Sequence, residues 1–293
     1  MSYDKVPHVL PYQGSKRKIA EEILESVDFD IKGSFIEPFA GSAAVSLLAI
    51  SKKKAKKYII ADKYKPISDL WILIRNNPIF VYEEYKKIWN EQFKDPKNHF
   101  TKIRSDFNND PDPIKFLYLM TRCVKNAIRF NSDGHFNQSS DNRRNGINPE
   151  KLKKSIINAS NLLSNNIEIL NLDFEEVLNY ANGDDFIYLD PPWQGTSFKA
   201  NKRYAYTLDF EKFIKNLSNL NKRNIPFILS FDGRCGEKKY GSDLPSSLSL
   251  LKIDINAGRS SQATLLGKDE ITVESLYLSP ALVARNIKYP VCA

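Results

Sequence analysis

A short stretch in the second half of the chain, Asp185 to Trp193, constrains the fold more than any other segment. Within it, Phe186 to Leu189 are bulky, apolar and rich in aromatic and branched types, which predicts a short buried strand. Pro191 and Pro192 cannot donate to a strand ladder, so the strand must end at Asp190. In open α/β sheets, ligands bind beyond the carboxyl ends of the strands. We therefore expect an α/β fold with Asp190 at the edge of a ligand site.

The residues that end this strand suit the binding of a planar base that carries an amino group. The Asp190 carboxylate can accept one N–H of the exocyclic amino group of adenine. A backbone carbonyl of Pro191 or Pro192, held by the fixed φ angle of proline, can accept the second, and Trp193 offers a face for stacking. Two acceptors can draw the nitrogen toward a tetrahedral shape and free its lone pair, which is otherwise delocalised into the ring. The alternative is a strand that ends at an Asp-Pro-Pro turn followed by a surface tryptophan.

The composition narrows the class of protein. The 293 residues are 42% hydrophobic and 27% charged, as in a soluble globular protein of one large domain or two closely joined ones. No apolar run is long enough for a transmembrane helix, and the N-terminus lacks the apolar core of a secretory signal, so we expect a cytoplasmic protein. The few cysteines and histidines are scattered, which favours reduced thiols and no metal site. The net charge of +8 permits a polyanionic partner.

A turn near the N-terminus precedes a predicted helix. Proline and glycine bracket the turn at Pro11 to Ser15, and a helix is predicted from Lys16 to about Val27 with Ser15 as its cap. Lysine and unpaired backbone N–H groups at a helix start suit an anionic or carboxylate-bearing ligand. A capped amphipathic helix with exposed basic residues is the alternative.

The next segment has the pattern of a nucleotide-binding unit. Ser34 to Val45 predicts a short strand, a tight turn of small residues and the start of a helix. Gly41 lets the chain turn sharply and approach a ligand closely. The following strand, Tyr58 to Ala61, places Asp62 at its end, where an acidic residue commonly holds the hydroxyls of a ribose. Together these features predict adenosine binding, although the glycine spacing is not that of a dinucleotide site.

Residues 71–165 differ in character from the segments around them. They are rich in Lys, Asn, Asp and aromatic residues, and helical periodicity appears at Phe80–Phe93 and Ile114–Ile128 without strands between them. This pattern predicts a mostly helical insert.

One part of this insert is suited to contact nucleic acid. The segment Arg122 to Asn137, followed by Arg143 and Arg144, interleaves arginine and asparagine with aromatic residues. Such residues contact phosphates, base edges and base faces. The alternative is a polar surface loop that turns at Asn-Ser-Asp-Gly.

Alternation of strands and helices resumes after the insert. The predicted strands are Asn166–Asn171, Pro226–Asp232 and Thr272–Leu278, and the predicted helices are Glu175–Tyr180 and Phe210–Leu220.

This second half adds candidate ligand contacts. Asp173 could accept a hydrogen bond from an adenine amino group with Phe174 against the ring, or it could cap the helix that follows. The polar loop Gly258–Gln262 could touch DNA, although such loop chemistry is common. A further loop, between the Asp-Pro-Pro-Trp stretch and the next helix, carries basic residues that suit a phosphate backbone, namely Lys199, Lys202 and Arg203.

Taken in order, these segments carry a family pattern. Trp/Tyr-x-Gly-Gly/Ser-Lys is matched by Tyr12–Lys16, and Glu-Pro-Phe-x-Gly by Glu37–Gly41. Asp62 matches the acid that ends the second strand, and Arg129–Asn137 matches Arg-x-Asn-x-x-Gly-x-Phe-Asn. Asp173–Phe174 matches Asp-Phe, and Asp190–Trp193 matches Asp-Pro-Pro-Tyr/Trp. The chain thus resembles the Dam-type DNA adenine-N6 methyltransferases, the α group of amino-methylating enzymes, over most of its length.

The resemblance implies a Rossmann-like methyltransferase sheet flanked by helices, with S-adenosylmethionine as the methyl donor. The residues implied to bind this cofactor are Tyr12, Lys16, Glu37, Pro38, Phe39, Ala40, Gly41, Asp62, Asp173, Phe174 and Asp190. The residues implied to be catalytic, by holding an adenine rotated out of double-stranded DNA, are Asp190, Pro191, Pro192 and Trp193. The residues expected to contact DNA are Arg122, Asn126, Arg129, Asn131, Asn137, Arg143, Arg144, Lys199, Lys202, Arg203 and Arg259.

The resemblance also implies an organisation and a mechanism. Residues 1–72 and 160–293 would form the catalytic domain, and residues 73–159 a target-recognition insert. Methyl transfer would be direct and in line, without a covalent cysteine intermediate. We expect a monomer or weak dimer from a restriction-modification system or a phage, with any cognate restriction endonuclease acting separately.

Two departures and several alternatives accompany this interpretation. Ala43 stands where the family usually has a second glycine, which could loosen cofactor affinity, and Gly258–Gln262 fits the late basic segment loosely. The alternative substrates are cytosine N4, an RNA base or a glutamine side chain. Enzymes that methylate glutamine prefer Asn at the position of Asp190, and those that methylate cytosine N4 usually carry Ser. A non-catalytic DNA-binding module would leave the cofactor turn and Asp-Pro-Pro-Trp without a use.

Overall fold

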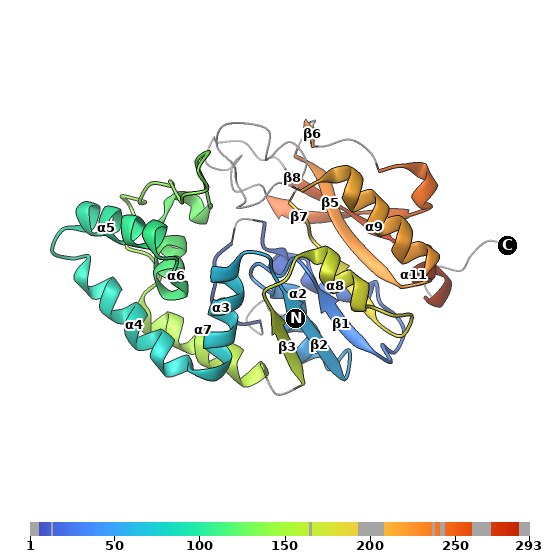
Figure 1. The fold of residues 1–293 in the computed structure, drawn as a ribbon, viewed down its shortest axis with the longest axis horizontal. Helices are drawn as coiled ribbons and strands as arrows, with labels where there is room; N and C mark the ends of the chain where they lie inside the picture. Colours follow the sequence, from blue (N-terminus) through green and yellow to red (C-terminus); the bar gives the residue numbers. More distant parts are fainter. Residues whose placement is uncertain are drawn as a thin grey trace.

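A central sheet organises the chain. The computed structural model describes residues 6–12, 14–163, 166–192, 208–235, 238–240, 244–259 and 271–286. The strands in this part of the chain are β1 (Ser34–Glu37), β2 (Lys57–Ala61), β3 (Ile167–Leu170), β4 (Phe186–Leu189), β5 (Phe227–Cys235), β6 (Lys238–Tyr240), β7 (Leu251–Arg259) and β8 (Ile271–Leu278). They form one sheet in the order β3-β2-β1-β4-β5-β8-β7, with β6 paired to β5 (Figure 1).

The strand order places a ligand crevice at a definite point. Strands β3, β2, β1, β4 and β5 are parallel, whereas β8 runs antiparallel to both β5 and β7. The chain builds outward from β1 through β2 to β3, and then returns to β4 on the other side of β1. The order therefore reverses between β1 and β4, and such a switch point is where open α/β sheets bind ligands. The α/β, Rossmann-like expectation is confirmed.

Each face of the sheet is covered by helices. One core, which contains Phe35 and Tyr188, packs against α1 (Ala20–Glu25), α2 (Ala44–Ser51), α3 (Lys65–Asn76) and α7 (Pro149–Leu162). The other, which contains Ile36 and Leu189, packs against α8 (Phe174–Tyr180) and α9 (Phe210–Lys222). Alternate residues of β1 and β4 thus enter opposite cores, as the period-two geometry of strands requires. A final helix, α11 (Pro280–Arg285), follows β8.

The helical insert lies between β2 and β3 in the sequence. Its further helices are α4 (Pro78–Glu91), α5 (Pro96–Asn109) and α6 (Pro113–Arg122). They extend beyond the β3 edge of the sheet, on the left of Figure 1, and share one hydrophobic core with the sheet face that carries α2. The boundaries of the two predicted domains stay a prediction. Among the described residues, no helix combines the length and apolar character that a membrane span needs.

Proline and a capping side chain define where several helices of the insert begin. Proline occupies the first turn of α4, α5, α6 and α7, where its missing N–H costs no helical hydrogen bond. The side chains of Asp95, Asp112 and Asn148 accept backbone N–H groups at the starts of α5, α6 and α7. The sequence thus fixes these helix starts locally.

Two predicted helices are shorter in the structure. The segment expected to be helical from Lys16 to about Val27 begins as a 3-10 turn, η2 (Lys16–Lys18), and becomes α1 after Ile19. The helix expected at Ile114–Ile128 ends at Arg122, because Lys125 and Asn126 in η3 (Val124–Asn126) adopt positive φ angles of 60° and 49°.

The C-terminal part contains a strand that the sequence reading missed. Strand β7 extends to Arg259, so the loop expected at Gly258–Gln262 is wrong for its first two residues. The register with β8 shifts between Asn256 and Arg259, and Gly258 takes a positive φ of 83° at that irregularity. A short 3-10 turn, η4 (Ser246–Leu248), precedes this strand.

Candidate active site

The N-terminal turn and the turn after β1 are joined. The Ser15 hydroxyl lies 2.8 Å from the Ser42 hydroxyl and makes no capping hydrogen bond, so its predicted role as a helix cap is wrong. The ring of Tyr12 lies against Gly41, where an added Cβ would stand 3.7 Å from the ring atoms. The first two motifs therefore lie against each other, and their contact with a cofactor stays a prediction.

Backbone geometry holds the turn after β1 close to the end of β2. The backbone N–H of Ala40 donates to the carbonyl of Ala61 at 2.9 Å, and that of Gly41 donates to Asp62 Oδ2 at 2.9 Å. Trp71 Nε1 donates to the Gly41 carbonyl at 3.0 Å. Gly41 and Ala43 both have positive φ, of 47° and 50°. The glycine adopts this conformation at little cost, whereas Ala43 is a strained exception where the family usually has glycine.

Two carboxylates lie at the carboxyl ends of β1 and β4, on the same face of the sheet. Glu37 lies two residues after Phe35 on β1, and Asp190 lies two residues after Tyr188 on β4; both rows belong to the core under α2. Glu37 is 3% exposed, and its Oε2 accepts the backbone N–H of Ser46 at the start of α2 at 2.9 Å. Acidic groups thus end the strands on both sides of the switch point.

A buried lysine neutralises part of this acidity. Lys16 is 4% exposed, and its Nζ lies 2.8 Å from Asp190 Oδ1 and 3.5 Å from Glu274 Oε2. The same ammonium donates to the Gly14 carbonyl at 3.0 Å. The side chains of Asp190 and Glu274 are 18% and 13% exposed, so the three charges are largely shielded from water. A pair shielded in this way is stronger than a surface ion pair.

Burial raises the pKa values of three of these acids. Burial raises the pKa of Glu37 to about 8, with the charges of Asp190 and Asp62 adding to the effect against the hydrogen bond from Ser46. Burial raises the pKa of Asp62 to about 6, although it accepts N–H groups from Tyr64 and Gly41. Burial also raises the pKa of Asp190 to about 6, with Lys16 opposing the rise and Glu274 adding to it. Ionising these three acids in the folded protein therefore costs free energy.

The residues after β2 connect three parts of the site. Asp62 accepts the backbone N–H of Gly41 and that of Tyr64, the latter at 2.8 Å. Lys63 Nζ forms an ion pair with Asp173 Oδ2 at 2.7 Å. The Tyr64 ring packs edge to face against Phe130 at 5.5 Å between centroids. This short segment thus links the cofactor turn, the start of α8 and the insert.

Asp173 and Phe174 are committed to structure at the start of α8. Asp173 caps this helix through the backbone N–H of Glu175 and forms a capping box with Glu176, which was one of its two expected roles. Phe174 is 8% exposed, and its ring stacks on that of Phe39 with centroids 5.1 Å apart. Both residues therefore adjoin the turn that carries Phe39, and their contact with a cofactor stays a prediction.

A short hairpin in the insert presents polar side chains. It spans residues 123–140, with bridges between Cys123 and Ser140 and between Phe130 and Phe136, and we call it the insert hairpin. Both phenylalanines are 1% exposed. Their neighbours Arg129 and Asn137 are exposed and lie opposite each other, joined by the hydrogen bond from the Asn137 N–H to the Arg129 carbonyl at 2.8 Å. Because alternate strand residues face opposite ways, these two side chains point away from the core.

The tip of the insert hairpin is held by one of the predicted DNA contacts. Asn131 Oδ1 accepts the backbone N–H groups of Asp133 and His135 at 3.0 and 2.9 Å. Gly134 has a φ of 80° at the turn, where an added Cβ would meet no atom within 4 Å. Asn131 therefore shapes the turn, which is the Asn-Ser-Asp-Gly turn named as the alternative interpretation.

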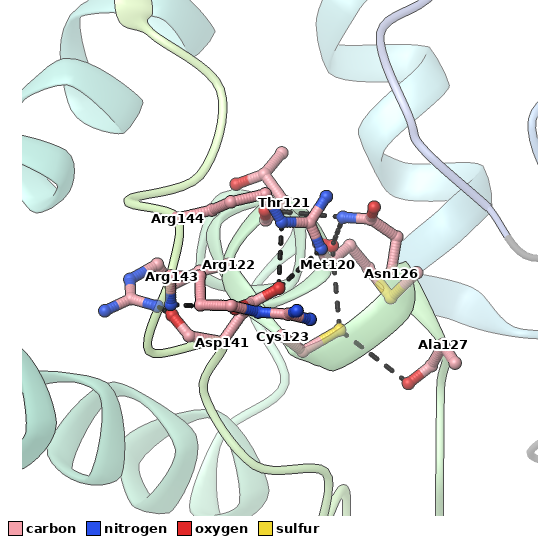
Figure 2. Close-up of polar contacts among 9 residues, drawn as sticks. All are labelled: Met120, Thr121, Arg122, Cys123, Asn126, Ala127, Asp141, Arg143 and Arg144. Carbon is pink, nitrogen blue, oxygen red and sulfur yellow. Dashed lines mark hydrogen bonds and ion pairs between the residues drawn. The ribbon is translucent and has the colours of Figure 1, made fainter. Parts of the chain in front are cut away.

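Arg122, by contrast, is buried at the base of the insert hairpin (Figure 2). It is 3% exposed, its Nε donates to Gln92 Oε1 at 2.9 Å, and its Nη1 donates to the Asp141 carbonyl. The Asp141 N–H donates in turn to the Arg122 carbonyl at 2.9 Å. Asn126 Nδ2 donates to the Met120 carbonyl at 2.8 Å. The polar groups of Arg122 and Asn126 thus hold the end of α6, and the expected contacts of these two residues with DNA stay a prediction.

The two arginines that follow are exposed and share one carboxylate (Figure 2). Asp141 is buried, and its Oδ2 lies 2.8 Å from Arg144 Nη2 while its Oδ1 accepts the backbone N–H of Arg143 at 2.9 Å. The side chains of Arg143 and Arg144 are 76% and 52% exposed. They stand where a polyanion can reach them.

Several expected contacts lie outside the described residues. These are Trp193, Lys199, Lys202 and Arg203, together with the side chain of Arg259. Pro191 is buried and Pro192 half-buried directly after Asp190, so the backbone at the end of β4 is described up to the tryptophan.

Sequence reasoning missed three residues of this arrangement. Glu274 lies within the predicted last strand, and an acid on a row that otherwise holds Leu276 and Leu278 is a signal that could have found it. Tyr64 and Asp141 carry no such signal, because their roles depend on contacts with residues far away in the sequence.

Comparisons with known proteins identify the family of the chain. Residues 12–256 match the family of D12 class N6 adenine-specific DNA methyltransferases. The chain is 29% identical over 247 residues to the type II methyltransferase M.MjaIII of Methanocaldococcus jannaschii, covering 77% of this chain and 84% of that protein. It is 26% identical over 218 residues to a DNA adenine methylase of Haemophilus influenzae, covering 71% and 73%.

A viral relative shows similar coverage. The type II methyltransferase M.CviBI of Paramecium bursaria Chlorella virus NC1A is 26% identical over 190 residues, covering 63% of this chain and 68% of that protein. The family match spans both halves of the sheet and the helical insert between them. The chain therefore belongs to the D12 class of N6 adenine-specific DNA methyltransferases.

Proposed function

We propose that the chain methylates adenines that are rotated out of double-stranded DNA, with S-adenosylmethionine as the methyl donor and Asp190 as the group that holds the amino nitrogen. The observation that carries this proposal is the buried contact between Lys16 Nζ and Asp190 Oδ1 at 2.8 Å, beside the switch point of the sheet. The family supplies the reaction class. The geometry supports the assignment of roles within it.

The charges of the site fit a cationic cofactor. Asp190 and Glu274 flank the buried Lys16 ammonium, and the charges of Asp190 and Asp62 act on the neighbouring Glu37. The raised pKa values of Glu37, Asp62 and Asp190 reflect the cost of ionising these acids in the protein interior. A ligand that brings positive charge lowers this cost. When bound, S-adenosylmethionine supplies an electrophilic methyl group on a positively charged sulfur.

The wall of the cofactor site follows from the joined turns. We assign Tyr12 and the turn from Glu37 to Gly41 to the walls, because the Tyr12 ring lies on Gly41. Asp62 is assigned to the ribose hydroxyls, because it ends β2 and already fixes the Gly41 backbone. Asp173 and Phe174 border the same turn through Phe39.

Asp190 performs two tasks in this proposal. Lys16 engages Oδ1, and Oδ2 then accepts one N–H of the flipped adenine while a carbonyl of Pro191 or Pro192 accepts the other. Both acceptors are strengthened as positive charge develops on N6, which is stabilisation of the transition state rather than of the ground state. The nitrogen gains a methyl group and releases one proton, which Asp190 is placed to receive. Trp193 provides the stacking surface for the base.

The insert hairpin and its base are the proposed DNA-reading surface. Arg129 and Asn137 point away from the core and are assigned to base edges and phosphates, and Arg143 and Arg144 to phosphates. Asn131 supports the tip of this hairpin. Lys199, Lys202, Arg203 and Arg259 remain expected phosphate contacts.

The biological setting extends the family assignment. We place the enzyme in the cytoplasm as a monomer or weak dimer, acting separately from any cognate restriction endonuclease in a restriction-modification system or phage. Relatives whose names include both type II methyltransferases and a DNA adenine methylase support a role in sequence-specific DNA modification.

One experiment tests reaction, base and specificity together. The purified protein is incubated with S-adenosylmethionine and unmethylated genomic DNA, and modified bases are mapped by single-molecule sequencing. We expect N6-methyladenine at one recurring short sequence with the parent protein. An Asp190→Asn variant should keep DNA binding and lose at least about 100-fold in rate, since an amide is a weaker acceptor than a carboxylate. Undiminished methylation by this variant would overturn the role of Asp190, and modified cytosine would overturn the choice of base.

A further inference from the structure

Strand β8 carries a carboxylate on the row that contains two buried leucines. Leu276 and Leu278 are fully buried in the core under α2, and Glu274 continues the same row toward the site. Its partner in register on β7 is Ile255, another apolar residue packed against this core. Burying a charge on such a row costs free energy unless an opposite charge or hydrogen bonds compensate it.

Glu274 faces the lysine that engages Asp190. Its Oε2 lies 3.5 Å from Lys16 Nζ, and among the described residues this buried oxygen has no hydrogen-bond partner. Lys16 therefore lies between two carboxylates, one at the end of β4 and one on β8. The contact to Glu274 is the longer one and is electrostatic rather than a hydrogen bond.

We propose that Glu274 is a positioning residue for methyl transfer: it anchors the Lys16 ammonium beside Asp190 and, through its own negative charge, keeps Asp190 a strong acceptor. This inference rests on the proposed role of Asp190. An ammonium paired with Asp190 alone would draw charge from the carboxylate and weaken its hold on the adenine N–H. A second carboxylate offsets that effect while the lysine stays fixed.

The groups that act on Asp190 come from several elements. Among the described residues they are Lys16 on η2, Glu37 on β1, Tyr188 on β4 and Glu274 on β8. Burial is the largest cause of the raised pKa of Asp190, Lys16 lowers it, and Glu274 raises it. Removing the charge of Glu274 therefore lowers the pKa of Asp190, which makes it a weaker base.

The test compares the pH dependence of variants that differ at one charge. With Glu274→Gln, the acidic limb of the kcat/KM profile for DNA methylation moves to lower pH by about 0.5 unit or more. Glu274→Asp keeps the charge and restores most of the parent profile. Glu274→Leu places an apolar side chain beside Leu276 and also moves the acidic limb to lower pH. This variant serves as the test if Glu274→Gln folds poorly.

A matched control removes a charge from the opposite face of the same sheet region. Asp254 on β7 accepts the Ser275 hydroxyl at 2.9 Å, and Ser275 faces away from the row that contains Glu274. Asp254→Asn leaves the acidic limb where it is in the parent protein. Equal shifts with Asp254→Asn and Glu274→Gln would overturn the proposal, because the effect would then be one of overall charge.

A second readout separates this proposal from the proposed function. Carboxyl carbons of ¹³C-labelled aspartate are titrated by NMR in the full-length protein, with the Asp190 signal assigned by its loss in Asp190→Asn. The proposal expects the Asp190 midpoint to fall in both Glu274→Gln and Glu274→Leu, whether or not DNA is methylated. An unmoved midpoint would overturn the proposal even in an active enzyme. A lowered midpoint in a protein that methylates nothing would reject the proposed reaction and the role of Glu274 in it, and would retain only the electrostatic effect of Glu274 on Asp190.

Discussion

Asp190 depends on one residue for its ionised state in the protein interior. Burial raises the pKa of the Asp190 carboxyl group, and Lys16 at 2.8 Å opposes that rise. The pKa of Asp190 still lies at about 6, above the usual value for aspartate. The group is therefore ionised at neutral pH and becomes protonated only slightly below it.

This balance predicts the pH dependence of methylation. Protonated Asp190 cannot accept the adenine N–H at the same oxygen with full strength, so kcat/KM falls about tenfold per pH unit below pH 6. In Lys16→Met, the pKa of Asp190 rises because the opposing cation is gone, and the acidic limb moves to higher pH. Methylation rates measured from pH 5 to 9 at saturating cofactor check this expectation. Lys18→Met, which changes an exposed lysine on the same turn, is the control. A limb that stays in place in Lys16→Met contradicts it.

Residues at strand ends could be predicted from the sequence, and residues that act across the sheet could not. Asp62 and Asp190 follow short apolar runs, and a strand that must stop fixes where the next polar side chain lies. The pairing of Lys16 with Glu274 joins residues far apart in the sequence, and it depends on β8 lying antiparallel beside β5. Local patterns carry no information on that pairing.

At the scale of elements, the insert hairpin and its base divide into a structural and an exposed part. Arg122 is 3% exposed and holds the end of α6 through Gln92 and the Asp141 carbonyl, whereas the side chain of Arg143 is 76% exposed. Two arginines in one segment thus differ in what they contact. The sequence predicts the same role for both, because the burial of Arg122 depends on contacts with Gln92 and Asp141, which are distant in the sequence.

Substitution of these two arginines separates stability from DNA binding. Arg122→Met leaves the Asp141 carbonyl without its donor and Gln92 Oε1 with only the Tyr118 hydroxyl at 3.4 Å, and it lowers the free energy of unfolding by about 2–4 kcal/mol. Arg143→Ala changes stability by less than about 0.5 kcal/mol, yet reduces DNA affinity and the slope of log K against log salt by about one unit. Urea unfolding and salt-dependent DNA titration measure the two quantities. A reversed pattern, with stable Arg122→Met and unstable Arg143→Ala, is incompatible with the contacts described.

The sequence marks the first residues of three helices in the insert more clearly than hydrophobic periodicity does. Asp95-Pro96, Asp112-Pro113 and Asn148-Pro149 each mark a cap followed by the first helical residue. Strand β7 was missed although Leu251 to Asn256 alternate apolar and polar residues, which is the pattern of a half-buried strand. The polar stretch that follows suggested a loop instead.

At the scale of the whole molecule, the acidic site reduces stability at neutral and higher pH. The pKa of Glu37 is raised to about 8, mainly by burial, so the folded protein binds more protons than the unfolded chain between about pH 4.5 and 8. The free energy of unfolding therefore falls as pH rises through that window, by up to about 1.4 kcal/mol per pH unit from this group. A cationic ligand at the site offsets this cost.

A single substitution tests that cost. Glu37→Gln keeps an acceptor for the Ser46 N–H and removes the charge, so without ligand it is more stable than the parent at pH 8.5 by a few kcal/mol, on the order of the linkage energy. At pH 5 the parent carboxyl is neutral, and the two proteins differ little. Glu168→Gln, at an exposed position on β3, is the control. Urea unfolding at both pH values measures the difference, and a gain of equal size at both pH values would refute the explanation.

The position of Tyr64 has a consequence for how the two substrates are bound. Its backbone N–H donates to Asp62 at the cofactor turn, while its ring packs against Phe130 of the insert hairpin. Were DNA to displace the insert hairpin, the movement would reach Asp62 through Tyr64. Thermodynamic reciprocity then requires that DNA change cofactor affinity by the same factor as cofactor changes DNA affinity. DNA and the methyl donor are therefore expected to bind with coupled affinities, whichever of the two binds first.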